Sequence, residues 1–195
     1  MIIVDLQTTG WNEQEDSIVS IGAVDFRNPE RLFHQKSRIP PGTSISPEAT
    51  RAFHFDRRTL FDQSRPSLRS ILRDFVTWAE VSDLRILAGQ NPWFDAAFLR
   101  ESLRRYHLPW LFGYRLVDLH SIFYSRLLLL GKEIPNANGV DSLSLDVILR
   151  HVGLEHKAAA NSALTNAKLE AEAFSRLIHG KGLLKEYEAY RIPRS

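Results

Sequence analysis

Two aspartates in this 195-residue sequence follow or open elements that look buried, and both have polar neighbours. Asp5 and Gln7 lie at the end of the apolar run MIIVDLQ, and Asp95 follows the turn GQNPW. Alternate residues of a strand point to one face, so the pattern places Asp5 and Gln7 side by side. Carboxylates that converge on divalent cations support two-metal phosphodiester hydrolysis, and Mg²⁺ prefers oxygen ligands. Asp5 and Asp95 are therefore candidate metal ligands.

A third polar segment, NSALTNAKLEAEAF, begins at Asn161 and carries Asn166 on an expected helix. The three segments are far apart in the sequence, so they form a site only if the fold brings their elements together. Each has an ordinary explanation when taken alone: Asp5 as a strand-end turn residue, and Asp95 as a first-turn carboxylate favoured by the helix dipole. Their joint order carries the functional interpretation.

The composition, with 44% apolar and 25% charged residues, is typical of a folded globular domain. The chain has no cysteine, which excludes disulfides, thiolate metal sites and a cysteine nucleophile. Neither a signal-like N-terminus nor an apolar stretch of about 20 residues is apparent, so we expect no membrane association and a cytoplasmic location. The net charge of +2 does not itself predict nucleic-acid binding. Five arginines within one region are candidates for a phosphate path: Arg100, Arg104, Arg105, Arg115 and Arg126.

Strands are expected at residues 1–7, 17–26, 31–38, 85–90 and 115–119, where apolar and β-branched residues cluster. Helical spacing predicts helices at 67–83, 93–106, 142–154 and 161–178, with a further helix ending near Leu130. The Gly-, Pro- and Asn-rich residues 131–141 indicate a surface loop. A meander followed by alternating helices and strands favours an α/β fold with a ribonuclease-H-like sheet.

These segments resemble the motifs of the DEDD superfamily of 3′-to-5′ exonucleases, of the ribonuclease T and DNA polymerase III proofreading-subunit type. IVDLQTTG followed by DSIVSIGAV is similar to the first motif, usually Asp-x-Glu-Thr-Thr-Gly with a following strand. GQNPWFDAAFL is similar to the second, usually His-Asn-x-x-Phe-Asp-x-x-Phe-Leu. SLSLDVILRHVGL resembles the helix before the third, and NSALTNAKLEAEAF resembles the third itself, usually His-x-Ala-Leu-x-Asp-Ala.

The resemblance implies a mixed five-stranded sheet flanked by helices, with an exonuclease-like domain over residues 1–180 and a tail or short helix over 181–195. It implies a histidine-type (DEDDh) active site with two Mg²⁺ or Mn²⁺ ions, and a single-stranded DNA or RNA 3′ end as the substrate. A homodimer or a larger nucleic-acid-processing complex stays open. The catalytic positions are Asp5, Gln7, Asp95, Asn161 and Asn166, the metal-binding ones Asp5, Asp95 and Asn166, and the substrate-binding ones Leu6, Thr8, Thr9, Gly10, Trp11, Asn91 and Phe94.

Three of these positions depart from the family pattern. Gln7 replaces the usual Glu, Asn161 the general-base His, and Asn166 the last metal-binding Asp. An amide carries no charge to offset a divalent cation. Asparagine also cannot accept a proton from water near neutral pH, so the contribution of the base, about 10² to 10⁴-fold, is lost. We therefore expect a protein that still binds a 3′ end but hydrolyses it weakly or not at all.

Two alternatives stay open at this stage. In the first, the enzyme is active with rearranged ligands: His156 replaces the missing base in a shifted register, or Glu170, four residues beyond Asn166 on the same helix face, supplies a carboxylate. In the second, the chain is a protein-interaction module that has kept the fold and lost the nucleic-acid role. Trp11 and Trp93 could stack on bases or pack within the protein, and Phe94 is expected in the core. His54 fits a structural role and a functional role equally well.

Overall fold

The computed structural model describes residues 1–40, 42–53, 57–155 and 162–193, and the side chain of Arg57 is not described. Its centre is a five-stranded sheet with the strand order β3-β2-β1-β4-β5. The first three strands form an antiparallel meander, and the last two run parallel to β1, so the sheet is mixed. The strands are β1 (Ile2–Thr8), β2 (Ile18–Asp25), β3 (Leu32–Lys36), β4 (Leu87–Gly89) and β5 (Leu116–Asp118). The predicted strands and fold class are thereby confirmed.

Strand β1 lies in the middle of the sheet and is buried on both faces. Val4 and Leu6 belong to the apolar core on one face, whereas Ile3 belongs to the core on the other. A strand covered on both sides has no polar face, which explains why its sequence is a nearly continuous apolar run. Asp5 and Gln7 therefore lie in a largely apolar environment.

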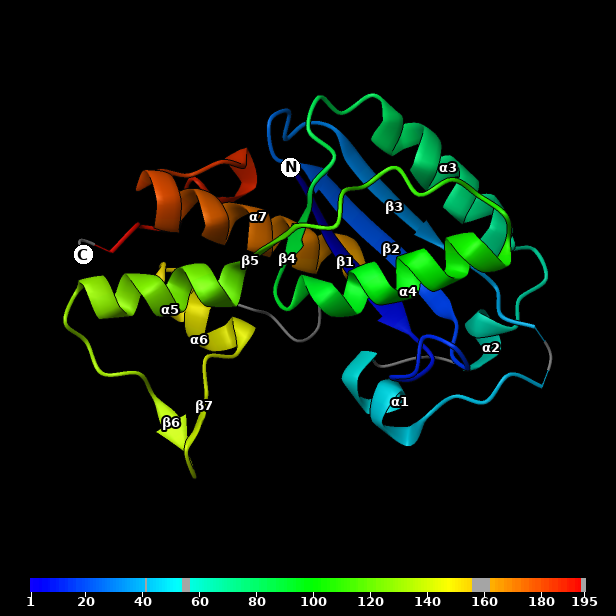
Figure 1. Ribbon diagram of the computed structural model, residues 1–195, viewed down its shortest axis with the longest axis horizontal. Coiled ribbons are helices and arrows are strands. Elements are labelled where there is room, and N and C mark those ends of the chain that lie inside the picture. Colours follow the sequence, from blue (N-terminus) through cyan, green and yellow to red (C-terminus); the bar gives the residue numbers. More distant parts are fainter. Residues whose placement is uncertain (41, 54–56, 156–161, 194–195) are drawn as a thin grey trace.

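Helices cover both faces of the sheet (Figure 1). Helices α3 (Leu68–Glu80) and α4 (Pro92–Arg105) contribute to the core around Phe75 and Phe98 on one face. Helices α5 (Leu119–Leu129), α6 (Leu145–His151) and α7 (Ala163–His179) contribute to the core around Phe123 and Phe174 on the other. The two layers bury the inner strands β1, β2 and β4, whereas β3 and β5 at the two edges are partly exposed.

The start of α7 lies directly against β2 because β2 carries a glycine there. A Cβ atom on Gly22 would lie 2.1 Å from the carbonyl carbon of Ala163 and 2.2 Å from the backbone nitrogen of Leu164. No side chain fits in that space. Ser162 caps the helix by accepting a hydrogen bond from the Thr165 backbone N–H, which fixes where the helix begins. This close approach carries Asn166 over the central strand.

The predicted loop at residues 131–141 contains a small hairpin that the sequence pattern did not indicate. Strands β6 (Asn136–Ala137) and β7 (Val140–Asp141) pair across Asn138 and Gly139, which have φ values of 55° and 79°. Asn-Gly is a favoured hairpin turn because both residues tolerate positive φ. All four strand residues are exposed, so no alternation of apolar and polar residues reveals the strands.

Other differences are confined to short elements. Helices α1 (Pro47–Phe53) and α2 (Arg57–Leu60) occupy a region for which no element was predicted, and α6 is shorter than the predicted helix at 142–154. The tail forms a single 3₁₀ turn, η2 (Lys185–Tyr187). It is tied to α7, because the carboxylate of Glu172 accepts the backbone N–H groups of Leu183 and Leu184. None of the described helices combines the length and the apolar composition that a membrane span requires.

Candidate active site

The structure brings Asp5 and Asp95 together near the C-terminal end of the central strand β1. Strand β4 pairs with β1 only at Ile2 and Ile3, so the backbone N–H of Leu6 extends beyond the paired part of β4. That N–H donates to Oδ1 of Asp95 at 2.9 Å, across 89 residues of sequence. A buried N–H group needs a partner, and Asp95 in the first turn of α4 provides it. The first and second motifs are thus joined directly.

Helix α7 brings Asn166 to the same place. Its Nδ2 group lies 3.4 Å from Oδ1 and 3.5 Å from Oδ2 of Asp5, and donates to both. Asn166 is 8% exposed and Gln7 is 3% exposed, so both amides are part of the buried site. The third motif therefore meets the first as the resemblance implies, but through an amide where the family pattern has a carboxylate.

Burial dominates the electrostatics of the two aspartates. It raises the pKa of Asp5 to about 8, and the hydrogen bond from Asn166 only partly opposes this effect. Burial also raises the pKa of Asp95 well above its ordinary value, and the neighbouring Asp5 raises it further. Two buried carboxyl groups that repel each other favour retention of a proton unless a cation balances them.

Glu170 lies buried beside these residues, one turn beyond Asn166 on α7. It is 2% exposed, its carboxyl group accepts the backbone N–H of Gln90, and Oε2 has no hydrogen-bond partner within the described residues. Burial, followed by the charges of Asp5 and Asp95, raises its pKa well above the ordinary value. A Cβ atom on Gly89 would lie 3.0 Å from Oε2, so Glu170 occupies space that this glycine leaves. The sequence suggested this approach only as one alternative.

The Thr-Thr-Gly segment uses its polar groups within the chain. Thr8 Oγ1 donates to the carbonyl oxygen of Gly10 at 2.6 Å, and Thr9 Oγ1 donates to Asp16 Oδ1 at 3.0 Å. Both threonines are completely buried, and a Cβ atom on Gly10 would collide with the carboxyl group of Asp16. The threonine side chains thus shape the loop after β1. Trp11, the residue that follows Gly10, is exposed.

Aromatic side chains form a surface beside the aspartates. The ring centroids of Trp11 and Phe94 are 5.6 Å apart, those of Trp93 and Phe94 are 6.3 Å apart, and those of Trp11 and Phe53 are 6.3 Å apart. Trp11 is 55% exposed and Trp93 is 66% exposed, whereas Phe94 is half-buried between them. Both tryptophans therefore present ring faces to solvent. Trp93 is two residues before Asp95, and Trp11 is six residues after Asp5. Such faces suit the stacking of bases.

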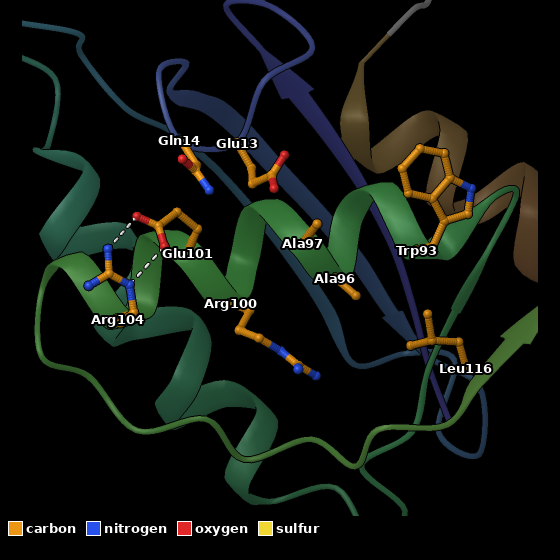
Figure 2. A pocket seen from close by; sticks show the side chains of 9 residues that line it. All are labelled: Glu13, Gln14, Trp93, Ala96, Ala97, Arg100, Glu101, Arg104 and Leu116. Atoms are coloured by element: carbon orange, nitrogen blue, oxygen red, sulfur yellow. Dashed lines mark hydrogen bonds and ion pairs between the residues drawn. The ribbon is translucent and has the colours of Figure 1, made fainter.

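A groove of about 390 Å³ runs along α4 next to Trp93 (Figure 2). Its charged groups compensate one another, because Arg104 forms two hydrogen bonds of 2.8 Å with Glu101. Arg100 lies 4.7 Å from the ring centroid of Trp110, and Glu13 also lines the groove. The mixed charge does not favour a phosphate path here. The predicted arginine cluster is also divided, because Arg126 lies on α5, which packs on the opposite face of the sheet.

Three polar residues near the site were not recognised from the sequence. Asp118 ends β5, caps α5 and accepts the backbone N–H of Asn91, whose φ and ψ are both 53°. His120 Nε2 lies 2.8 Å from Oδ1 of Asp141. The signal was an aspartate at the end of a parallel strand, a position where sites commonly form in α/β sheets. Asn161, His156 and His54, which the sequence analysis also named, lie outside the described residues.

The residues that are described do not fit a two-metal centre. Within residues 1–40, 42–53, 57–155 and 162–193, no three histidine, aspartate or glutamate side chains are grouped so that they could hold a metal ion. Gln7 and Asn166 contribute neutral amides, and Asn166 donates an N–H toward Asp5, whereas a cation needs oxygen lone pairs there. The donor set thus lacks the charge that two divalent cations require.

Sequence comparison finds relatives among bacterial DNA polymerase III proteins, and no family model matches the chain. The chain is 26% identical over 178 residues to the PolC-type DNA polymerase III of Thermotoga maritima. This match covers 91% of the chain and 12% of that polymerase. It is also 29% identical over 99 residues to the DNA polymerase III subunit epsilon of Treponema pallidum, covering 51% of the chain and 44% of that subunit. The chain thus spans about an eighth of the PolC-type relatives.

Solved structures of exonucleases have the same fold. The nuclease domain of 3′hExo, a DEDDh family member bound to rAMP, matches with a TM-score of 0.68 at 15% identity, covering 100% of this chain and 96% of that domain. Exonuclease I of E. coli in a complex with single-stranded DNA matches with a TM-score of 0.74 at 15% identity, covering 92% and 40% of the two chains. The chain therefore has the fold of these exonucleases, with a ribonuclease-H-like mixed sheet. The resemblance to the DEDD 3′-to-5′ exonuclease superfamily is confirmed.

Proposed function

We propose that this chain binds the 3′ end of single-stranded nucleic acid in an exonuclease cleft and hydrolyses it weakly or not at all. The observation that carries the proposal is the contact between Asn166 and Asp5, in which an amide N–H faces the carboxylate at 3.4 Å. In an active two-metal centre, a cation has to approach that carboxylate. The amide N–H stabilises the carboxylate by a hydrogen bond, but it does not supply the positive charge of a cation.

The remaining substitutions weaken the chemistry further. Gln7, two residues from Asp5 on the same strand face, is buried and neutral, so it adds no charge for a cation. Asn161 stands at the position of the general base in the motif and cannot accept a proton near neutral pH. Binding a substrate does not depend on these two groups in the same way, because it needs contact surface more than proton transfer.

The aromatic surface supports retained binding. Trp11 and Trp93 expose ring faces on either side of Phe94, close to the ends of β1 and the start of α4. Stacking of a base on an aromatic ring is worth about 1 to 3 kcal/mol and tolerates any base, so it suits a strand end of any sequence. The structural relatives include proteins described as bound to rAMP or to single-stranded DNA, which agrees with this use of the fold.

Glu170 favours a second candidate, hydrolysis with rearranged ligands. Its buried carboxyl group interacts electrostatically with Asp5 and Asp95, and one of its oxygens has no hydrogen-bond partner within the described residues. In this structure the three carboxylates are not grouped closely enough to hold a metal ion, so this candidate requires Glu170 to move toward Asp5 and Asp95 when a cation binds. The cation would then relieve the mutual repulsion that raises their pKa values. This candidate predicts Mn²⁺-dependent trimming that Glu170→Gln abolishes. The first candidate predicts no such trimming.

The proposed function implies that the chain works in the cytoplasm as part of a nucleic-acid-processing complex. The relatives named as DNA polymerase III proteins support this proposal. A homodimer is the simpler assembly, and size determination in solution distinguishes the two. A protein-interaction module without any nucleic-acid role is the outcome to be excluded by the binding experiment.

Binding is tested with fluorescent single-stranded DNA and RNA oligonucleotides in EDTA, each with either a free 3′ hydroxyl or a 3′ phosphate. We expect binding that prefers the free 3′ hydroxyl and weakens as salt rises from 50 to 200 mM, because phosphate contacts release counterions. The DNA and RNA arms identify the preferred sugar. Absence of salt-dependent binding to every oligonucleotide would overturn the proposal and favour the protein-interaction module.

A further inference from the structure

A second cavity lies where the C-terminal ends of α5, α6 and α7 meet the C-terminal segment. Figure 1 shows the end of α7 and the C-terminus at the edge of the molecule where α5 also ends. The cavity has a volume of about 680 Å³, which is within the range of small-molecule sites. It is lined by Arg126, Lys132, His151, Val152, Arg176, Leu177, Ile178, Gly180, Ile192 and Pro193.

The charged and titratable residues of the lining are all basic. The side chains of Arg126 and Lys132 form no hydrogen bond or ion pair with any group in the described ranges, and both lower the pKa of His151, after the larger effect of burial. Arg176 differs, because it is buried and its Nε donates to Glu172 at 2.7 Å. Glu133 follows Lys132 in the sequence but does not line the cavity. Two cations thus lie together without an anion from the described part of the chain.

Helix dipoles account only in part for this arrangement. Basic residues are favoured at helix C-termini, where backbone carbonyl groups carry partial negative charge. Here those carbonyl groups already have partners: Gly180 N–H donates to the Arg176 carbonyl oxygen, and Val152 N–H donates to that of Ile148. Arg176 N–H groups also take the carbonyl oxygens of Val152 and Tyr187. The donors of Arg126 and Lys132 stay available for a ligand.

One wall of the cavity is apolar. Leu177 and Ile178 line it and also line an adjoining cleft of about 490 Å³ together with Ile122 and Leu129. Ile178 and Leu129 are exposed. A small anion alone leaves this wall uncovered, whereas a phosphate attached to a nucleoside covers it with the sugar and base. The combination of free cations with an apolar wall favours a nucleotide over inorganic phosphate.

We propose that the cavity between the ends of α5, α6 and α7 binds the phosphate group of a nucleotide, either free or within a nucleic-acid strand. Arg126 and Lys132 provide the charged donors, His151 adds a third donor in its protonated form, and Leu177 and Ile178 contact the nucleoside. The cavity lies toward the opposite end of α5 from the candidate active site, and the adjoining cleft is lined by both Asp118 and Arg126. Asp118 is at the start of α5 and Arg126 is eight residues later, or about 12 Å along the helix axis.

The test is calorimetric titration of the double variant Arg126→Ala/Lys132→Ala with three probes: inorganic phosphate, dAMP and a single-stranded DNA 12-mer. We expect the wild-type chain to bind dAMP or the 12-mer, and the variant to lose about tenfold or more in affinity, as expected when a charge-assisted hydrogen bond is removed. The control variant Arg69→Ala/Arg85→Ala removes the same charge from exposed sites elsewhere and should change affinity less than threefold. Equal affinities for both variants would overturn the proposal.

A second readout reports on the cavity itself. The imidazole resonances of His151, identified by their loss in His151→Gln among the seven histidines, give its pKa by NMR. A bound phosphate favours the imidazolium form, so the pKa of His151 should rise when the probe is added. A rise with dAMP in the Trp11→Ala/Trp93→Ala background keeps this site distinct from the 3′-end cleft. If no probe changes the pKa of His151 in the wild-type chain, the proposal is wrong. The probes distinguish the two forms of the ligand. If the ligand is a free nucleotide, only dAMP raises the pKa of His151; if it is a nucleic-acid strand, the 12-mer raises this pKa more strongly than dAMP does.

Discussion

The side-chain amide of Asn166 donates to both carboxylate oxygens of Asp5, at 3.4 and 3.5 Å. The two residues are 161 positions apart, and their contact is the point where the first and third exonuclease motifs meet. The contact places a neutral amide where the family pattern has a carboxylate.

Replacing the amide by a carboxylate should create a cation requirement. In EDTA, Asn166→Asp adds a further carboxyl group beside Asp5, Asp95 and Glu170, so we expect a loss of about 1 kcal/mol or more in the free energy of unfolding. Mn²⁺ should restore it, raising the melting temperature of the variant more than that of the wild-type chain. Asn136→Asp, on the exposed hairpin, is the matched control. Identical responses of Asn166→Asp and the wild-type chain to Mn²⁺ would show that the carboxylates do not share a cation.

The raised pKa values predict that stability falls as pH rises. The folded chain keeps protons on Asp5 up to pH about 8, whereas the unfolded chain loses them near 3.8. Glu170 is raised in the same direction from 4.5. The folded state therefore binds more protons between these limits, and the free energy of unfolding decreases from pH 5 to pH 8. Urea unfolding in EDTA measures this slope. Glu170→Gln should make it shallower by up to about 1.4 kcal/mol per pH unit, because one titrating group that keeps its proton in the folded chain is removed. An unchanged slope would contradict the assignment.

Glu172 provides a contrast on the same helix. It is completely buried like Glu170, but it pairs with Arg176 at 2.7 Å and accepts two backbone N–H groups from the tail. Glu172→Gln leaves the buried Arg176 without its counter-charge, so we expect a loss of about 3 to 5 kcal/mol. An effect as small as that of an exposed residue would mean that the tail and α7 are not held by this ion pair.

Gly22 should tolerate no side chain. A Cβ atom there would lie 2.1 to 2.3 Å from backbone atoms of Ala163 and Leu164, so Gly22→Ala must move α7 away from β2. We expect a loss of about 3 kcal/mol or more, at the upper end of overpacking effects. The control is Gly113→Ala, where the nearest atom is 4.0 Å away and φ is not positive. Chemical denaturation compares the two variants, and equal stabilities would show that α7 does not approach β2 this closely.

Trp11 and Trp93 should carry much of the binding to single strands. Replacing either by alanine removes one stacking face, which is worth about 1 to 3 kcal/mol, or roughly 5- to 150-fold in affinity. Tyr114→Ala removes a still more exposed ring that precedes β5, and should have little effect. Fluorescence anisotropy with a labelled oligonucleotide measures the difference. Equal losses for Trp93→Ala and Tyr114→Ala would mean that the aromatic surface is not the binding surface.

Much of the fold was predictable because strong local patterns agree with the tertiary structure. The meander, the long helices α3, α4 and α7, and the order of motifs follow from apolar periodicity and from the residues at element ends. The hairpin at Asn138 and Gly139 was missed because its short strands are exposed and carry no apolar pattern. Sequence order indicated that Asp5, Asp95 and Asn166 share a site, but not which atoms meet.

Burial of Glu170 was harder to predict. Helical spacing places it on the same side of α7 as Asn166, yet whether a carboxylate one turn away is exposed or buried depends on the neighbouring strand. Here Gly89 leaves space for its carboxyl group, and the backbone N–H of Gln90 binds it. Such a compensation between distant residues has no signature in either segment alone. The same holds for Asp118, whose contact with Asn91 depends on the pairing of β4 with β5.

Hydrolysis is measured most directly as the rate at which single nucleotides are released from the 3′ end of single-stranded DNA and RNA, in Mg²⁺ and in Mn²⁺. The wild-type chain is compared with the triple variant Gln7→Glu/Asn161→His/Asn166→Asp. We predict little or no release by the wild-type chain and a gain of at least about 10²-fold in the triple variant, because the charge of the site and its general base are restored. Rapid 3′ trimming by the wild-type chain, abolished by Asp5→Ala, would contradict the account.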